Sequence, residues 1–220
     1  MPINKSMVVR VAPFIFYILV MILSGILAEM KMDVRWIYAI RAGGTALILF
    51  YLRRQYAELA WPPSISLRTF MFSVLIGLLV FLLWINLDQQ WMVLGKAVGY
   101  DPRMANGGLS YPMAALRLAG AALVVPLMEE LFWRSFLMRW IDRMDFMSLS
   151  PASVSLKAIV LSSLLFASEH TYWFAGLIAG LAYAWLYFKT QNLWTSIFAH
   201  AVTNAALGVW VVYTGQWLYW

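Results

Sequence analysis

Long runs of uncharged, mostly apolar residues recur along this 220-residue sequence. Each run has at least 17 residues, and the runs cover residues 11–28, 69–87, 171–188 and 193–220, the last with His200 taken as neutral. A helix rises about 1.5 Å per residue, so each run can cross the roughly 30 Å hydrocarbon layer of a membrane. Apolar residues make up 63% of the sequence and charged residues 12%, which excludes an ordinary soluble domain. The sequence therefore predicts an integral membrane protein.

Charge and cysteine content exclude further classes of protein. The sequence has no cysteine, so neither a disulfide scaffold nor a thiol nucleophile is available. The net charge is +6, but the lysines and arginines lie between the apolar runs and form no basic face, so we expect no nucleic-acid partner. Nine of them fall in connections on the side of the N-terminus and four on the other side, which predicts a cytoplasmic N-terminus. The first 30 residues superficially resemble a signal peptide, but the apolar run is long and a cleavage site is lacking, so we expect a membrane helix there.

The pattern predicts an all-α polytopic transmembrane bundle with about seven (six to eight) membrane helices and an active site inside the bundle. The expected helices are residues 11–28, 36–52, 69–87, 112–138, 153–170, 171–188 and 193–213. We expect a single transmembrane domain over 1–220, in which 1–100 supply N-terminal helices of unassigned role and 110–210 the helices that carry polar motifs. The tryptophans expected near membrane interfaces are Trp61, Trp84, Trp91, Trp140, Trp194 and Trp217.

Two connections between these elements carry further expectations. Residues 88–111 form the longest connection, are rich in glycine, and are predicted to be a polar external loop with a surface helix in its first half. The alternative is a lid over a site. In the expected helix 171–188, Gly176, Gly180 and Ala184 recur every four residues, which predicts the close approach of a neighbouring helix.

Ionisable groups inside these runs need a reason, because each unpaired charge costs at least a few kcal/mol in lipid. The expected helix 112–138 contains Glu129, Glu130 and Arg134. Glu130 and Arg134 are four residues apart and can pair, whereas Glu129 points about 100° away and is left for another partner. Pro126 deprives the carbonyl of Ala122 of its helical donor, which favours local water.

Both histidines of the chain lie in the apolar C-terminal half. His170 ends the expected helix 153–170, while His200 and Asn204 are four residues apart on one face of the last helix. At about 1.5 Å per residue from the cytoplasmic ends, Glu129 lies roughly 13 Å deep, His200 roughly 10 Å and His170 roughly 20 Å. These depths predict that the polar groups meet in one hydrated layer. Glu169 is interpreted as an interfacial charge.

Three ordered motifs carry a resemblance to a known family. They are Glu129-Glu130-Leu-Phe-Trp-Arg134, Phe166-Ala-Ser-Glu-His170 and His200-Ala-Val-Thr-Asn204. Over residues 110–210 the sequence resembles the CAAX-protease and bacteriocin-processing family of intramembrane proteases, also called the Abi family, and more loosely a bacterial subgroup named CAAX prenyl protease-related. The resemblance implies a glutamic-type endopeptidase without a cofactor in a bacterial inner membrane, acting on a membrane-associated protein or peptide.

The resemblance also implies a role for each motif residue. Glu129 is the general base that activates water, assisted by His170, and Asn204 with His200 stabilises the oxyanion. Glu130 and Arg134 hold the site in shape, and Arg134 is also a candidate for recognising a substrate carboxylate. The chemistry agrees, because peptide hydrolysis needs a base beside a water, a proton donor for the leaving amine and donors aimed at the developing negative charge.

Other interpretations of the same residues stay open. Glu129, His170 and His200 could be three zinc ligands of a membrane metalloprotease, although the sequence has no His-Glu-x-x-His motif. Alternatively, the same groups could tie helices together in a non-catalytic scaffold, immunity protein or small transporter. Arg41 and Arg117, also inside expected helices, are interpreted as reaching the interface or pairing with a carboxylate, without chemistry of their own.

Overall fold

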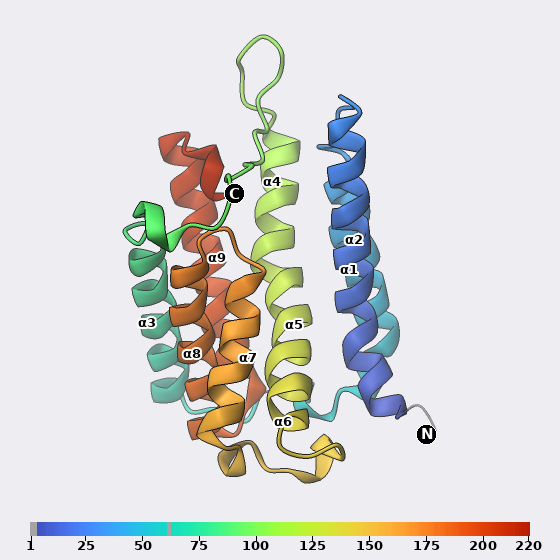
Figure 1. The fold of residues 1–220 in the computed structure, drawn as a ribbon, viewed down its shortest axis with the longest axis vertical. Coiled ribbons are helices and arrows are strands. Elements are labelled where there is room, and N and C mark those ends of the chain that lie inside the picture. Colours follow the sequence, from blue (N-terminus) through green and yellow to red (C-terminus); the bar gives the residue numbers. More distant parts are fainter. Residues whose placement is uncertain (1–3, 61–62) are drawn as a thin grey trace.

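The structure is a computed structural model that describes residues 4–60 and 63–220, so Trp61 lies outside the described residues. Within these ranges the chain forms helices and no β-strand, and most helices run along the long axis of the molecule (Figure 1). The predicted all-α membrane bundle is confirmed. The helices are α1 (Lys5–Glu29), α2 (Ile37–Leu52), α3 (Leu67–Trp84), α4 (Tyr111–Ala119), α5 (Val125–Glu130), α6 (Met138–Trp140), α7 (Leu156–Ser168), α8 (Trp173–Thr190) and α9 (Leu193–Thr214).

The helices α4, α5 and α6 are parts of one continuous rod, Tyr111–Trp140, which brings the described rods to the seven that were expected. They are joined by two π-helical turns, Gly120–Val124 and Leu131–Leu137. This rod, α1, α3 and α9 are long and apolar enough to cross a membrane. The helices α2 and α7 are shorter, with 16 and 13 residues. Short 3₁₀ turns cover Arg53–Gln55, Ala57–Leu59, Gln90–Met92, Phe146–Ser148, Pro151–Ser153 and Trp217–Tyr219.

Two helices begin at residues other than those predicted, and the N-cap residues account for both starts. The first begins at Lys5, earlier than expected, because the side chain of Asn4 accepts a hydrogen bond from the backbone N–H of Ser6. The expected helix 153–170 begins at Leu156 after the N-cap Ser155 and ends at Ser168. His170 therefore lies in the turn between α7 and α8 and not on a helix, which corrects the prediction. The expected surface helix within 88–111 is only the three-residue turn Gln90–Met92.

The rod Tyr111–Trp140 stands between two groups of helices (Figure 1). On one side α1 packs along α2, and on the other α3 packs along α9 and α7 along α8. The expected close approach at Gly176 and Gly180 occurs between α8 and α7. A Cβ atom placed on Gly180 would lie 3.1 Å from Cβ of Ser163, and one on Gly176 would lie 3.3 Å from Cβ of His170. The small residues therefore also fix where His170 sits.

A buried ionic cluster ties α1 to the rod near the N-terminal end of α1. Arg10 is 1% exposed and pairs with Glu58, which follows α2, at 2.6 Å. Ser135 of the rod hydrogen bonds to Glu58 and accepts from Arg10 Nε at 3.1 Å and from Arg139 at 3.0 Å. Arg10 therefore has a structural contact in addition to the topological role expected from its charge.

Candidate active site

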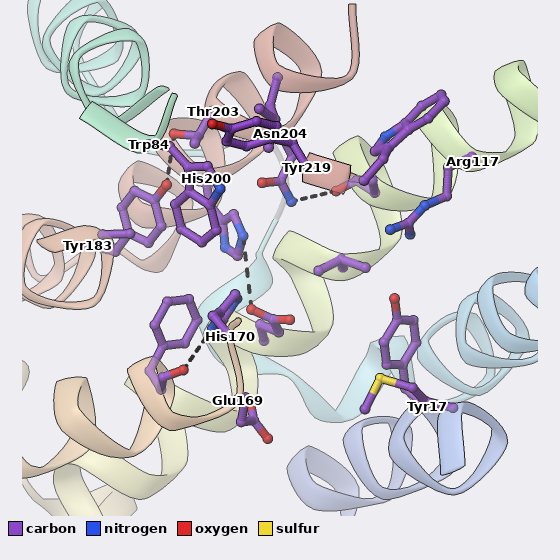
Figure 2. A pocket seen from close by; sticks show the side chains of 18 of the residues that line it. Tyr17, Trp84, Arg117, Glu169, His170, Tyr183, His200, Thr203, Asn204 and Tyr219 are labelled. Carbon is purple, nitrogen blue, oxygen red and sulfur yellow. Dashed lines mark hydrogen bonds and ion pairs between the residues drawn. The ribbon is translucent and has the colours of Figure 1, made fainter. Parts of the chain in front are cut away.

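One cavity of about 240 Å³ inside the bundle brings together residues from the three sequence motifs. Its walls include Glu129 from the rod, His170 from the turn after α7, and His200 and Asn204 from α9. Figure 2 shows His170 and His200 on one side of this cavity and Arg117 and Tyr17 on the other. The predicted convergence of carboxylate, imidazoles and amide thus exists as a geometric arrangement.

Glu129 and Glu130 contact opposite nitrogens of the His200 ring. Glu130 is fully buried, and its Oε1 accepts from His200 Nδ1 at 2.9 Å. Because Nδ1 donates to Glu130, the other nitrogen, Nε2, is directed to Glu129, whose Oε2 lies 3.9 Å away. Among the described residues, this Oε2 atom is buried and has no hydrogen-bond partner. Glu129 thus keeps one oxygen without a hydrogen-bond partner among the described residues.

His170 is held by the end of the preceding helix, α7, and by aromatic rings. Its Nδ1 donates to the carbonyl oxygen of Phe166 at 2.8 Å, because a carbonyl can only accept. The ring also contacts Phe166, with centroids 4.6 Å apart, and the edge of Trp84 at 5.4 Å. In a neutral imidazole this leaves the lone pair on Nε2. A ring held in this way is suited to accepting a hydrogen bond from a water in the cavity.

Arg134 pairs with Glu130, as the spacing of four residues predicts. Its Nε lies 3.1 Å from Oε2 of Glu130, and its terminal nitrogen donates to the carbonyl of Gly180 at 3.2 Å. The guanidinium also lies 4.5 Å from the ring centre of Phe166. Arg134 is 2% exposed and is not among the described residues that line the cavity. This position favours the supporting role expected of Arg134 over contact with a substrate carboxylate.

Asn204 satisfies a backbone carbonyl that Pro126 leaves without a donor. In the turn Gly120–Val124 the hydrogen bonds span five residues, as in that from Val125 N–H to Gly120. Pro126 has no N–H, so in this register it leaves the carbonyl of Ala121 free, and Asn204 Nδ2 donates to it at 2.8 Å. The expectation named the carbonyl of Ala122 because it assumed α-helical register, whereas in the π-helical register the carbonyl opposite Pro126 is that of Ala121. One N–H of the Asn204 amide remains for other contacts.

Tyr183 and Thr203 support His200 and were not identified from the sequence. The Tyr183 ring stacks on His200 with centroids 4.9 Å apart and an interplanar angle of 19°. The hydroxyl of Tyr183 donates to Thr203 at 2.7 Å, and Thr203 in turn donates to the carbonyl of Gly77 at 2.8 Å. The signal available in the sequence was a tyrosine inside an apolar helix, since a buried phenol needs a hydrogen-bond partner.

Three further charged residues line the cavity in addition to the motif residues. Glu169, taken as an interfacial charge, lies in its wall beside His170. Arg41 and Arg117 also line it, and neither forms an ion pair with a carboxylate of the described residues. In residues 4–60 and 63–220, no group of three or more histidine, aspartate or glutamate side chains has an arrangement that could hold a metal ion.

Residues 111–206 match the model of a family described as type II CAAX prenyl endopeptidase Rce1-like. Over this segment the chain is similar to the Rce1-like family. The matched segment contains all six candidate site residues from Glu129 to Asn204, and its bounds agree with the resemblance seen over 110–210. This similarity supports, in general terms, a CAAX-protease-like intramembrane endopeptidase. No curated protein and no solved structure matches the chain.

Proposed function

We propose that the protein is an intramembrane endopeptidase in which Glu129 and His170 activate a water that hydrolyses a peptide bond. The substrate is a membrane-associated protein or peptide. One observation carries the proposal: Glu129, whose Oε2 has no hydrogen-bond partner among the described residues, lines the same cavity as His170, His200 and Asn204. A buried carboxylate oxygen without a hydrogen bond lowers the stability of the fold. A carboxylate in that position therefore supports a functional role for Glu129 over a purely structural one.

The first step is attack of water on the scissile carbonyl. The water oxygen bonds to the carbonyl carbon while its proton passes to Glu129, and His170 accepts a hydrogen bond from the same water through Nε2. The carbonyl oxygen takes the electron pair of the C=O bond and becomes an oxyanion. When the C–N bond breaks, the proton held by Glu129 passes to the leaving amine, so that one water is consumed for each bond cleaved.

The oxyanion is stabilised by donors from α9. The second N–H of Asn204 is available because the first is bound to Ala121. His200 contributes from Nε2 when it carries a proton there, and the Glu130 carboxylate on Nδ1 balances that charge. Such fixed donors in a site that excludes bulk water cost no reorganisation during the reaction. Arg134 keeps Glu130 in place through its contact at 3.1 Å.

The proposal extends to the setting of the protein. The protein lies in the bilayer of a bacterial inner membrane with its N-terminus in the cytoplasm, as the distribution of lysine and arginine favours. Residues 1–220 act as one transmembrane unit, since α1 and α2 contribute Tyr17 and Arg41 to the cavity that contains Glu129.

A comparison of membrane peptides tests this proposal. Membranes from cells that carry either the wild-type protein or the Glu129→Gln variant are analysed for new peptide termini by mass spectrometry. We expect termini that occur only with the wild type and that identify the bond cleaved. Identical termini in both membranes would overturn the proposal.

Metal analysis of the purified active protein tests the zinc alternative. Stoichiometric zinc, whose removal abolishes cleavage and whose return restores it, would favour a zinc mechanism over the glutamate mechanism.

A further inference from the structure

Two neighbouring cavities in the bundle share one wall. The cavity that contains Glu129, called here the inner cavity, has a volume of about 240 Å³, and its neighbour, the outer cavity, about 650 Å³. The described residues that line both cavities are Met21, Arg41, Arg117 and Trp220. Met21, Arg41 and Arg117 lie on α1, α2 and α4, whereas Trp220 lies in the segment after α9. Trp220 is therefore the part of the shared wall that can move without the shift of a long helix.

Residues 215–220, called here the strap, turn back at the end of α9. Gly215 ends this helix with a φ of 71°, a left-handed conformation that favours glycine and that reverses the direction of the chain. The 3₁₀ turn Trp217–Tyr219 follows, and both Tyr219 and Trp220 line the inner cavity. Figure 2 shows Tyr219 at the same end of this cavity as Asn204. The strap thus places two aromatic side chains in the wall of the candidate active site.

The outer part of the strap is held by a small number of contacts near the surface. The hydroxyl of Tyr219 donates to Asp88 at 3.0 Å in an exposed hydrogen bond, called here the latch, and the Tyr219 ring stacks on Tyr172 with centroids 4.7 Å apart. The carbonyl of Trp220 accepts from the backbone N–H of Tyr100 at 3.0 Å. A segment that is held by exposed hydrogen bonds opens at a lower free energy than the core. The strap can therefore release while the helices stay in place.

The ring of Trp220 is buried, but its polar atom is not satisfied. Trp220 is 9% exposed and packs with Ala114 of the rod and with Leu207 and Val211 of α9. Its indole Nε1 atom has no hydrogen-bond partner among the described residues. A buried tryptophan N–H usually has a partner, so the closed position of this ring lacks a hydrogen bond that contact with water would supply. This deficit lowers the free-energy cost of moving the ring out of the wall.

We propose that the strap is a gate between the two cavities. Trp220 closes the inner cavity while Tyr219 is latched to Asp88, and the release of this latch lets Trp220 leave the shared wall and joins the outer cavity to Glu129. The proposal rests on the proposed function in one respect, because it takes the inner cavity as the place that a substrate must reach. A gate of this kind admits the substrate when open and keeps bulk water from the catalytic groups when closed.

Thiol labelling of the full chain in nanodiscs tests the gate, because the sequence has no cysteine of its own. Ala121→Cys places one thiol in the inner cavity, and Val98→Cys, at a residue that is 90% exposed, places one in the outer cavity. The probe is sulfonatoethyl methanethiosulfonate, and mass spectrometry measures the rate of modification. We expect Ala121→Cys to react at least about 10-fold more slowly than Val98→Cys, because the inner thiol is exposed only in the open fraction of molecules.

Substitutions in the strap should change the rate at the inner thiol alone. Tyr219→Phe removes the latch and keeps the stacked ring, so it should raise the rate at Ala121→Cys by about 3- to 10-fold, the size of one hydrogen bond, and leave Val98→Cys unchanged. Trp220→Ala removes the closing ring and should bring the inner rate close to the outer one. Tyr213→Phe, the same change at an exposed tyrosine of α9, is the matched control and should alter neither rate. An equal rise with Tyr213→Phe would contradict the latch.

Two results would overturn the gate. Equal rates at Ala121→Cys and Val98→Cys with the strap unchanged would show that the inner cavity is already open. An inner rate that Tyr219→Phe leaves unchanged, in a variant with the Tm of its parent, would show that the strap does not control access, and this result does not require Trp220→Ala to fold. Labelling does not depend on cleavage, so failure of the proposed protease function would be seen separately, as identical membrane termini with wild type and Glu129→Gln.

Discussion

The carboxylate of Glu129 lies 3.9 Å from Nε2 of His200, on the side of the imidazole opposite to Glu130. Two neighbouring residues of one rod thus contact one histidine of α9 from two directions. Glu130 accepts a hydrogen bond from His200 on Oε1, and its Oε2 lies 3.1 Å from Arg134 Nε in an ion pair that no hydrogen bond accompanies. Glu129 keeps an oxygen without a protein hydrogen bond. This difference in partners predicts different consequences for substitutions at the supporting and the catalytic positions.

Arg134→Lys is expected to lower both stability and activity. An ammonium group cannot contact Glu130 and the carbonyl of Gly180 together in the plane that the guanidinium uses, and it loses the stacking on Phe166. An unsatisfied buried polar group costs about 1–3 kcal/mol of unfolding free energy. Thermal unfolding in nanodiscs measures the loss of stability. The value of kcat/KM, on the substrate found by peptide analysis, measures the loss of activity. Arg53→Lys, at an exposed arginine, is the control, and wild-type values for Arg134→Lys would contradict the supporting role.

Asn204→Ala is expected to reduce turnover by about 10²–10³-fold, the loss typical of one oxyanion donor. It also removes the donor to the carbonyl of Ala121, at a cost of about 1–3 kcal/mol. The rate of peptide cleavage and the Tm of the purified variant are the measurements. An unchanged rate would remove Asn204 from the oxyanion role.

The two effects of Asn204→Ala can be separated by adding Pro126→Ala. The second substitution restores an N–H that can donate to Ala121 in the five-residue register of the π-helical turn. We expect the double variant to regain Tm relative to Asn204→Ala but not turnover. Recovery of both would mean that Asn204 acts only by supporting the rod.

The sequence predicts the helical rods and the residues that meet, because both depend on signals carried by the chain itself. The length of an uncharged run indicates whether a helix can cross the membrane. Ionisable groups within such runs indicate where side chains are shielded from lipid. The pairing of Glu130 with Arg134 also follows from their spacing, since both lie on one helix. The assignment of catalytic roles to these residues remains a prediction.

Features that depend on contacts between distant segments could not be predicted. The π-helical turn at Gly120–Val124, and hence the contact between Asn204 and Ala121, depends on how α9 packs against the rod. His170 lies outside a helix because α7 ends at Ser168, a boundary that hydropathy does not mark. Arg41 lies on α2, far from the three motifs in the sequence, yet it lines the cavity. A single sequence does not show that such distant segments meet.

The contact between Arg10 and Glu58 predicts that stability falls in acid. Burial acts to raise the pKa of Glu58, but the hydrogen bonds and charge of Arg10, with a hydrogen bond from Ser135, outweigh it, and the pKa lies below its ordinary value. A group with a lowered pKa in the folded state stabilises the protein at neutral pH, and this contribution is lost as pH falls from the unfolded pKa of about 4.5 through the folded value.

Thermal unfolding between pH 7 and pH 3 measures this loss. Glu58→Gln should lower the unfolding free energy at pH 7 by about 3 kcal/mol, because Arg10 stays buried without its carboxylate. The difference in Tm between wild type and Glu58→Gln should shrink toward pH 3. A difference that stays constant over this range would show that the charge of Glu58 does not stabilise the fold.

The most direct test of the mechanism is the cleavage rate of purified Glu129→Gln, measured together with its Tm and beside Glu130→Gln and His170→Ala. Because the Glu129 oxygen has no hydrogen-bond partner to lose, we expect Glu129→Gln to abolish cleavage while its Tm stays within a few degrees of wild type. His170→Ala should behave in the same way, whereas Glu130→Gln should lower Tm as well as activity because it breaks two buried contacts. Cleavage by Glu129→Gln at the wild-type rate would contradict the mechanism, and unfolding of that variant would make Glu129 a structural residue.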